Sequence, residues 1–168
     1  MNQHWLKPNW EPGTSITDIP LQHLFDEGIK AIILDVDKTL LYGRDVVLHY
    51  SVLSWVMNAK KHLKLHLLSN NPSKERIESV SNQLEVPFTY KAAKPRRSSL
   101  QRVIKGMQIY PTKIAMVGDR IFTDILAGNR LGLYTILVKP IGPDGSSCPN
   151  AKIQLLEQKL ARYLGAEQ

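Results

Sequence analysis

The stretch AIILDVDKT, residues 31–39, combines the two features that decide the fold. Its first residues are apolar without a break, as in a parallel strand that helices cover on both faces. Asp35 and Asp37 follow with one residue between them, and residues at i and i+2 of an extended segment point to the same side. The stretch therefore predicts a buried strand that presents two carboxylates together at its carboxyl end.

Four more apolar runs rich in Ile, Leu and Val follow the first one, and segments with helical spacing alternate with them. The five predicted strands are 31–36, 65–69, 88–92, 114–119 and 134–138. The predicted helices cover 52–63, 77–84, 100–107, 121–125 and 153–164, with Ser73 as a cap, Pro95 near the start of the third and Gly132 closing the fourth. This alternation predicts an α/β fold: a three-layer, Rossmann-like open parallel sheet of about five strands with right-handed crossovers.

The length and composition limit the class of protein. The 168 residues suffice for a single domain, in which residues 1–24 are expected to form an irregular segment. The single cysteine, Cys148, excludes an internal disulfide and fits a reducing compartment. The chain starts without an apolar signal region and contains no run of about 18 apolar residues, so we expect a cytoplasmic protein, at most peripheral to a membrane.

Polar groups that suit phosphate chemistry stand at or just after the ends of four predicted strands. They are Asp35 and Asp37, Ser69 and Asn70, Lys94, and Asp119 with Asp124 on the following turn. The carboxyl ends of parallel strands meet at one edge of a sheet, where such folds bind ligands. The sequence therefore predicts that all these side chains share one site.

The residue types at this edge favour phosphoryl transfer with a cation. Two close carboxylates repel each other, and oxygen ligands in small number suit Mg²⁺, which Asp119 and Asp124 can also reach. One carboxylate can attack phosphorus, and the other can move a proton. Taken singly, each residue has an ordinary explanation, such as a turn cap, a solvated lysine, or for Asp124 a favourable charge at a helix start.

Four motifs in order resemble those of the haloacid dehalogenase (HAD) superfamily of phosphohydrolases. They are DVDKT at 35–39, the Ser69 of LLSN, the Lys94 of KP, and GDRIFTD at 118–124. The lead-in GIKAIILDVDKTL and the stretch GDRIFTDILAGNRLGLYTILVKPI are similar to the YqeG-type group of subfamily IIIA, which is itself similar to phosphatidylglycerophosphate phosphatases. Lys38 departs from the superfamily, in which Asn or Gly is commoner at this position.

The resemblance implies a role for each motif residue. Asp35 would be the nucleophile and a metal ligand, and Asp37 the general acid and base that also offers its backbone carbonyl to the metal. Ser69 and Lys94, with Asn70 beside them, would bind the phosphoryl group. Asp119 and Asp124 would complete the magnesium site.

The gaps between motifs leave no room for an inserted cap domain, so we expect an open site that suits a bulky substrate. The formal charge of +7, from 22 Lys and Arg against 15 Asp and Glu, favours an anionic partner. The leading substrate is a phosphomonoester on an anionic lipid headgroup, such as phosphatidylglycerophosphate. Arg96 and Arg97 would then lie at the substrate rim, and Trp5, Lys7 and Trp10 at the membrane interface.

Three alternatives remain open at this point. The enzyme could instead act on nucleic-acid ends or on a soluble sugar or nucleotide phosphate. A non-catalytic phosphoacceptor signalling domain also uses an Asp, a hydroxyl residue and a Lys on an α/β sheet, although nothing in it requires a second carboxylate at i+2. A nucleic-acid-binding module is disfavoured, since the basic residues are not interleaved with aromatic ones.

Overall fold

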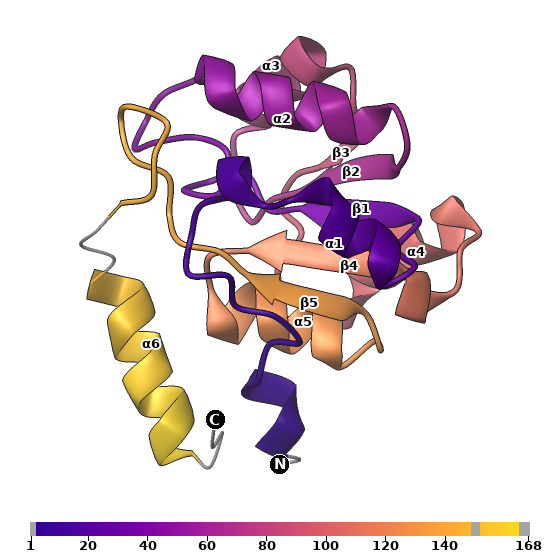
Figure 1. The fold of residues 1–168 in the computed structure, drawn as a ribbon, viewed down its shortest axis with the longest axis vertical. Coiled ribbons are helices and arrows are strands. Elements are labelled where there is room, and N and C mark those ends of the chain that lie inside the picture. Colours follow the sequence, from indigo (N-terminus) through magenta and orange to yellow (C-terminus); the bar gives the residue numbers. More distant parts are fainter. Residues whose placement is uncertain (1–2, 149–151, 165–168) are drawn as a thin grey trace.

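The computed structural model describes residues 3–148 and 152–164, and its centre is a five-stranded parallel sheet (Figure 1). The strands are β1 (Ala31–Leu34), β2 (Lys64–Leu68), β3 (Phe88–Thr89), β4 (Ile114–Gly118) and β5 (Tyr134–Leu137). Their order in the sheet is β3-β2-β1-β4-β5, and every pair is parallel. The predicted fold class is thus confirmed, and β1 occupies the central position.

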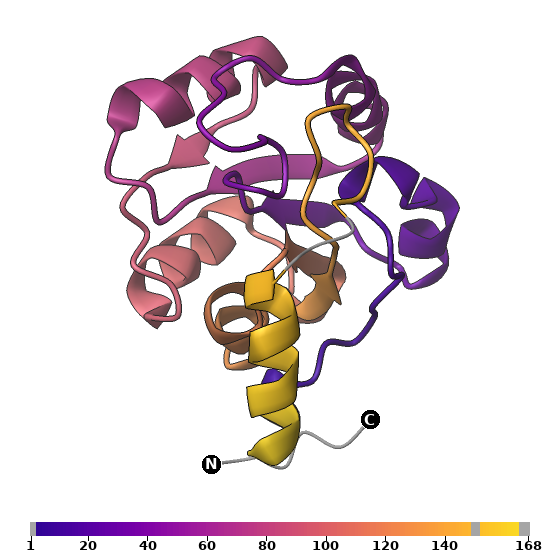
Figure 2. The same ribbon diagram turned by 90° about the vertical axis from the view of Figure 1, so that its left-hand side faces the viewer.

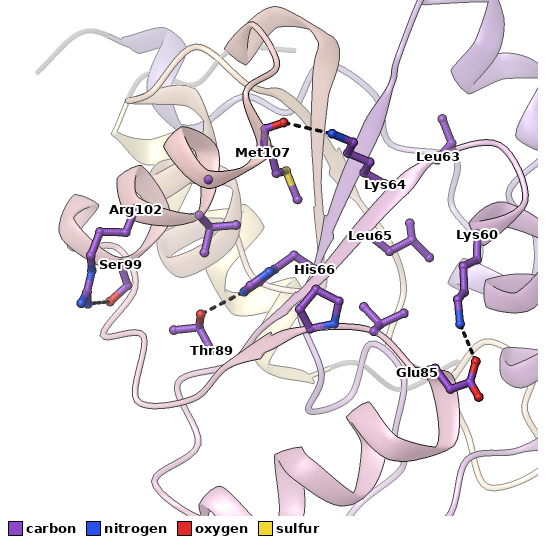
Figure 3. A pocket seen from close by; sticks show the side chains of 14 residues that line it. Lys60, Leu63, Lys64, Leu65, His66, Glu85, Thr89, Ser99, Arg102 and Met107 are labelled. Atoms are coloured by element: carbon purple, nitrogen blue, oxygen red, sulfur yellow. Dashed lines mark hydrogen bonds and ion pairs between the residues drawn. The ribbon is translucent and has the colours of Figure 1, made fainter.

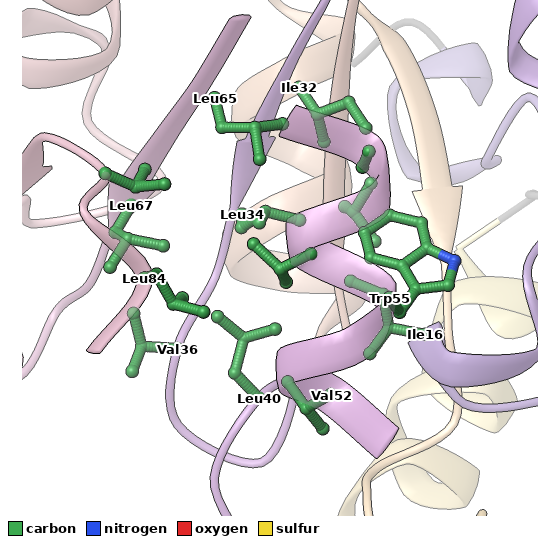
Figure 4. Packing of buried hydrophobic residues seen from close by; sticks show 14 of the residues in the cluster. Ile16, Ile32, Leu34, Val36, Leu40, Val52, Trp55, Leu65, Leu67 and Leu84 are labelled. Carbon is green, nitrogen blue, oxygen red and sulfur yellow. The ribbon is translucent and has the colours of Figure 1, made fainter. Parts of the chain in front are cut away.

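The helices lie on both faces of this sheet and give it three layers. They are α1 (Leu21–Asp26), α2 (Tyr50–Lys60), α3 (Lys74–Leu84), α4 (Arg97–Met107), α5 (Leu126–Asn129) and α6 (Lys152–Tyr163). Ile32 and Leu34 pack with Trp55 of α2 on one face (Figure 4). Ile33 packs with Leu100 of α4 on the other face. All four residues of β1 are therefore buried, which explains the unbroken apolar run.

The strands end earlier than the sequence pattern predicts. β1 ends at Leu34 and β4 at Gly118, so Asp35 and Asp119 stand just past the strands rather than within them. β3 has only two residues instead of five, because Lys91 and Ala93 take positive φ angles of 49° and 58° that are incompatible with an extended strand. The strand therefore ends at Thr89, and the chain that follows it leads to Lys94 in the cavity described below.

The helical boundaries follow the predicted signals closely. The Ser73 hydroxyl caps α3 by accepting the Arg76 backbone N–H at 3.2 Å. The segment after β4 begins with a π-helical turn, Ile121–Ile125, before α5 continues it. The chain then turns at Gly132, whose φ is +72°.

The N-terminal segment is more ordered than the expected irregular stretch over residues 1–24. It contains short 3₁₀ turns at Gln3–Leu6 and Ile16–Asp18, and α1 begins at residue 21. Trp10 exchanges backbone hydrogen bonds with Thr135 and Leu137, so the segment lines the free edge of β5. The centroids of the Trp10 and His23 rings are 3.9 Å apart, so Trp10 packs against its own domain.

The last helix, α6, lies at the edge toward which the strands point (Figures 1 and 2). It contacts the turn that follows β4. Among the described residues, no helix is both long and apolar enough to cross a membrane.

Candidate active site

Most of the predicted site residues converge at the carboxyl edge of the sheet, around a cavity of about 160 Å³. Asp35 and Asp119 follow the neighbouring strands β1 and β4, and the Asp35 backbone N–H still bonds the Val117 carbonyl at 2.9 Å. The residues that line the cavity are Asp35, Asp37, Lys38, Asn70, Lys94, Asp119, Arg120, Thr123 and Asp124. Six of them were predicted as site residues from the sequence.

Three buried carboxylates form the centre of the site. Asp35, Asp119 and Asp124 each bring an oxygen within 4.8 Å of the others, although they are only 8%, 2% and 1% exposed. Burial raises the pKa of Asp35 to about 7, although Lys94 acts against this rise. Burial, followed by the charges of Asp35 and Asp124, raises the pKa of Asp119 to about 8. A cluster so rich in oxygen donors and negative charge could hold a small divalent cation.

Lys94 supplies a buried positive charge to this cluster. Its Nζ lies 2.6 Å from Asp35 Oδ1, 2.7 Å from Asp124 Oδ1 and 2.7 Å from the Leu68 carbonyl oxygen. Burial alone would lower the pKa of the ammonium, but Asp124 and Asp35 raise it above its ordinary value. Lys94 is therefore a fixed cation that can also face a phosphoryl group.

Asn70 positions the lysine rather than standing free in the cavity. Its side-chain oxygen accepts the Lys94 backbone N–H at 2.7 Å, and its amide nitrogen donates to the Lys94 carbonyl at 2.9 Å. This pair of bonds ties the end of β2 to the segment after β3. The predicted phosphate-binding role of Asn70 therefore stays a prediction, whereas its contact with Lys94 is structural.

The Asp37 carboxylate is held by three side chains outside the cluster of buried carboxylates. Its Oδ2 accepts the Ser69 hydroxyl at 3.1 Å, the Asn71 side-chain amide lies 3.2 Å from both of its oxygens, and Arg76 Nε lies 3.2 Å from Oδ1. Arg76 is itself fixed by the carbonyls of residues 43 and 44. Sequence reasoning did not find Asn71 or Arg76, because no motif marks them.

Ser69 is fully buried and does not line the cavity. Its hydroxyl donates to Asp37 and accepts the Asn71 backbone N–H at 3.0 Å. Thr39 acts similarly on the nucleophile candidate, because its buried hydroxyl donates to Asp35 Oδ2 at 3.2 Å. Both hydroxyls orient a carboxylate in this structure.

The turn after β4 brings Asp124 into the cluster. A Cβ on Gly118 would collide with the Asp124 carboxylate, so only glycine permits this approach. The Arg120 backbone N–H donates to Asp124 Oδ2 at 3.2 Å. In the GDRIFTD motif, the glycine thus serves close packing, and the second aspartate adds its charge to the cluster.

Two side chains of α6 hold the same turn from outside. Gln154 Nε2 donates to the Asp119 carbonyl at 2.9 Å and to the Val138 carbonyl at 2.7 Å. Glu157 accepts the Ile121 backbone N–H at 2.8 Å and the Arg120 Nε–H at 2.7 Å. These contacts were not predicted, since they depend on where α6 docks.

A second cavity, of about 470 Å³, adjoins the site and shares Lys38 and Asp119 with it. It lies between the segment after β1 and the first turn of α6, and its lining includes Tyr42, Ile141, Lys152 and Ile153. Lys38 takes a positive φ of 67°, which turns the chain at the boundary of the two cavities. The site therefore opens into a larger, partly apolar space.

Another cavity, of about 650 Å³, lies elsewhere, between α4 and β2 (Figure 3). Its His66 bonds the Thr89 hydroxyl at 2.9 Å, and burial lowers the pKa of the imidazole to about 4. The cavity lacks the clustered carboxylates of the carboxyl edge. We therefore do not assign the catalytic chemistry to it.

Arg96 and Arg97, predicted at the substrate rim, are exposed at the start of α4. Neither lines the site cavity, whose cationic lining consists of Lys38, Lys94 and Arg120. Arg120 lies in the fourth motif and pairs with Glu157. It was not predicted as a site residue, although its place beside Asp119 offered a signal.

The fold and this cluster of carboxylates with a lysine are those of a HAD-type phosphatase, and comparisons with known proteins agree. The HAD-hydrolase-like family model matches residues 91–140. A HAD family hydrolase structure from Streptomyces avermitilis superimposes with a TM-score of 0.57 at 16% identity, covering 83% of this chain and 86% of that one, which supports the fold.

Two relatives with similar sequences narrow the family to which the chain belongs. The probable phosphatase YqeG of Bacillus subtilis is 34% identical over 128 residues, which cover 76% of this chain and 74% of that protein. The mitochondrial phosphatidylglycerophosphatase GEP4 of Saccharomyces cerevisiae is 26% identical over 164 residues, covering 90% of this chain and 85% of that protein. The chain therefore belongs to the HAD superfamily, in the same family as YqeG.

Proposed function

We propose that this phosphatase hydrolyses a phosphomonoester through an aspartyl-phosphate on Asp35, with Mg²⁺ as its metal. The observation that carries the proposal is the position of Asp35 in one cavity with Lys94, Asp119 and Asp124. Lys94 and Asp35 are 2.6 Å apart, so a phosphoryl group that meets the carboxylate also meets the ammonium. The Asp35 carboxylate can thus attack phosphorus at the place where the Lys94 ammonium can stabilise the charge of the phosphoryl group.

The proposed reaction has two steps. In the first, an Asp35 oxygen forms a bond to phosphorus while the bond from phosphorus to the leaving oxygen breaks, and Asp37 gives that oxygen a proton. In the second, water attacks the phosphorus of the aspartyl-phosphate and its proton goes to Asp37, which releases inorganic phosphate and restores Asp35. Asp37 lines the same cavity, where Ser69, Asn71 and Arg76 hold its carboxylate.

Asp35, Asp119 and Asp124 are the residues that would hold the metal, with the Asp37 carbonyl as a further ligand. The fit rests on three buried carboxylates whose oxygens lie within 4.8 Å of one another, with one lysine to offset their charge. Bound there, Mg²⁺ would neutralise charge on the phosphoryl oxygens during transfer.

The proposed substrate is a phosphomonoester on an anionic lipid headgroup, phosphatidylglycerophosphate being the leading candidate. The activity named for the GEP4 relative supports it. A site without a cap would also suit a large headgroup, and the element order supports this: α2 is the one helix between β1 and β2, and α3 the one between β2 and β3. The adjoining 470 Å³ cavity offers room beside the site for part of a large headgroup.

The test uses purified protein with Mg²⁺ and two kinds of substrate. Asp35→Asn should reduce turnover of p-nitrophenyl phosphate to background with the fold intact, while Asp26→Asn, at the opposite end of β1 and exposed, should match wild type. Near-normal turnover by Asp35→Asn would refute the mechanism. A kcat/KM for a soluble sugar or nucleotide phosphate, or for a nucleic-acid end, about tenfold above that for phosphatidylglycerophosphate in vesicles would refute the lipid substrate alone.

A further inference from the structure

Helix α6 presents its apolar positions to solvent and its polar positions to the protein. Its buried residues are Gln154, Glu157 and Ala161. Its exposed apolar residues are Ile153 (45%), Leu155 (53%), Leu156 (66%), Leu160 (48%) and Tyr163 (87%), and Leu164 (48%) follows it directly. A helix on the surface of a globular domain normally buries its apolar stripe. The inward contacts of Gln154 and Glu157 with the turn after β4 fix α6 in this inverted orientation.

The exposed apolar residues form one continuous stripe. Ile153, Leu156, Leu160 and Leu164 stand at i, i+3, i+7 and i+11, which is one face of a helix. Such a stripe is larger than scattered surface apolar residues and indicates a contact surface. We call these four residues the α6 stripe.

Basic residues flank the α6 stripe. Lys152 and Lys159 stand four positions before Leu156 and Tyr163, so they lie beside the apolar residues on the neighbouring face. Lys152, Lys159 and Arg162 are exposed, whereas Glu157, the one acidic residue of the described helix, faces inward and pairs with Arg120. The outward side of α6 thus combines apolar and positively charged groups without an acidic one.

The α6 stripe lies on the same side of the molecule as the site. Figure 2, which looks at the edge toward which the strands point, shows α6 in front of the sheet. The 470 Å³ cavity joins the two, because Lys152 and Ile153 line it at one end and Lys38 and Asp119 line both it and the site. A surface that contacts α6 would therefore lie next to the opening of the site.

We infer that α6 docks the protein on an anionic lipid bilayer, with the α6 stripe in the boundary between headgroups and acyl chains. An interfacial helix of this kind carries apolar residues on one face and Lys or Arg beside them. This inference rests on the proposed lipid substrate. Docking through α6 would bring the carboxyl edge of the sheet, and with it the site, to the lipid headgroups.

A bilayer fits this surface better than a second copy of the chain. A symmetric contact through α6 would place two copies of the same basic surface against each other, and like charges repel. Anionic headgroups complement them instead. Trp5 and Trp10, which the sequence suggested for the membrane interface, are half-buried and stack near Arg130 and His23. The structure thus assigns the contact to α6.

The test is flotation with vesicles that contain no phosphomonoester, so that binding is measured apart from catalysis. Wild-type protein should bind vesicles of phosphatidylcholine with phosphatidylglycerol at least about tenfold better than vesicles of phosphatidylcholine alone. Leu156→Ser/Leu160→Ser/Leu164→Ser should lose at least about tenfold in binding while its circular dichroism stays that of wild type. Tyr110→Ser, which removes an 82% exposed ring before β4, is the matched control and should bind like wild type.

Two outcomes would overturn the inference. In the first, wild-type protein does not float with anionic vesicles; in the second, the triple variant floats as well as wild type does. A dimer that the triple substitution disrupts, without vesicle binding, would assign the α6 stripe to a second copy instead. Magnesium-dependent turnover of p-nitrophenyl phosphate is measured separately, so failure of the proposed function and failure of docking remain distinct.

Discussion

Asp35 and Asp37 have the same side chain and stand two residues apart, yet the structure gives them different surroundings. Asp35 is 8% exposed, bonded to Lys94 and surrounded by Asp119 and Asp124. The Asp37 side chain is 36% exposed and is held by Ser69, Asn71 and Arg76. One carboxylate is part of a buried charged cluster, and the other is tied to a surface segment.

This difference indicates how one strand end can supply two chemical functions. A carboxylate that is fixed beside a buried cation suits a nucleophile, because the cation can stabilise the charge that develops on the transferred group. A carboxylate at the rim can exchange protons with solvent and with a leaving group. Disturbing each environment separately should therefore give different losses of stability and activity.

The largest effect on stability is expected when the buried cation is removed. Lys94→Met leaves Asp35 and Asp124 without their ion-pair partner, and breaking a buried pair costs about 3 kcal/mol or more. Turnover should also fall by about 10²–10³-fold, because the phosphoryl group loses a fixed positive charge. Urea unfolding and p-nitrophenyl phosphate hydrolysis measure the two losses. Lys91→Met, at an exposed lysine of the same segment, should change neither, and equal effects in both variants would contradict the role of Lys94.

Asp37 should separate activity from stability. Asp37→Asn removes the proton donor and acceptor but few buried contacts, so kcat should fall by about 10²–10⁴-fold while unfolding changes by about 1 kcal/mol or less. The loss should be greater for an alkyl phosphate than for p-nitrophenyl phosphate, whose weakly basic leaving group needs less help from an acid. An equal loss on both substrates would argue against Asp37 as the acid.

The sequence was sufficient to predict the parts of the fold that repeat a local pattern. The apolar runs located all five strands. The polar residues that follow these runs include Asp35, Lys94, Asp119 and Asp124, which line one cavity in the structure. These predictions succeed because a parallel sheet places every carboxyl end at the same edge. The catalytic roles themselves stay predictions.

Contacts that depend on tertiary packing were not predicted. Arg76 reaches Asp37 across 39 positions of the chain, and nothing near either residue encodes that meeting. The spacing of Ile153, Leu156 and Leu160 predicted a helix correctly, but the usual burial of such a stripe does not hold. Two polar side chains, Gln154 and Glu157, decide the orientation of α6 by bonding the turn after β4.

The buried cluster should also make the metal-free protein less stable at higher pH. The pKa of Asp119 is about 8 and that of Asp35 about 7 when folded, against an ordinary value of 3.8. A carboxyl group with a raised pKa stabilises the folded state where it is protonated, and this stability is lost as pH rises through the folded pKa. The free energy of unfolding should fall by about 2 kcal/mol or more between about pH 5 and pH 8.

The comparison for this pH dependence is Asp119→Asn, which cannot ionise at that position. Its free energy of unfolding should depend less on pH than that of wild type over the same window, and added Mg²⁺ should flatten the wild-type curve. Chemical unfolding with a chelator present measures both proteins. A wild-type stability that stays level or rises with pH relative to Asp119→Asn would contradict the buried repulsion.

The smallest expected effect concerns the arginine that holds the rim carboxylate. Arg76→Gln removes the ion pair with Asp37 and the bonds to the carbonyls of residues 43 and 44, so both Asp37 and the segment after β1 lose an anchor. Because the Asp37 side chain is over a third exposed, the pair should contribute only about 1 kcal/mol or less to stability. Orientation of a proton-transfer group matters more to rate, so we expect kcat to fall about tenfold with KM little changed. Arg102→Gln, at an exposed arginine of α4, is the control and should keep wild-type kcat. If Arg76→Gln raised kcat instead, the ion pair would be a restraint that Asp37 must break in every turnover, and Asp37→Asn/Arg76→Gln should then be no faster than Asp37→Asn alone.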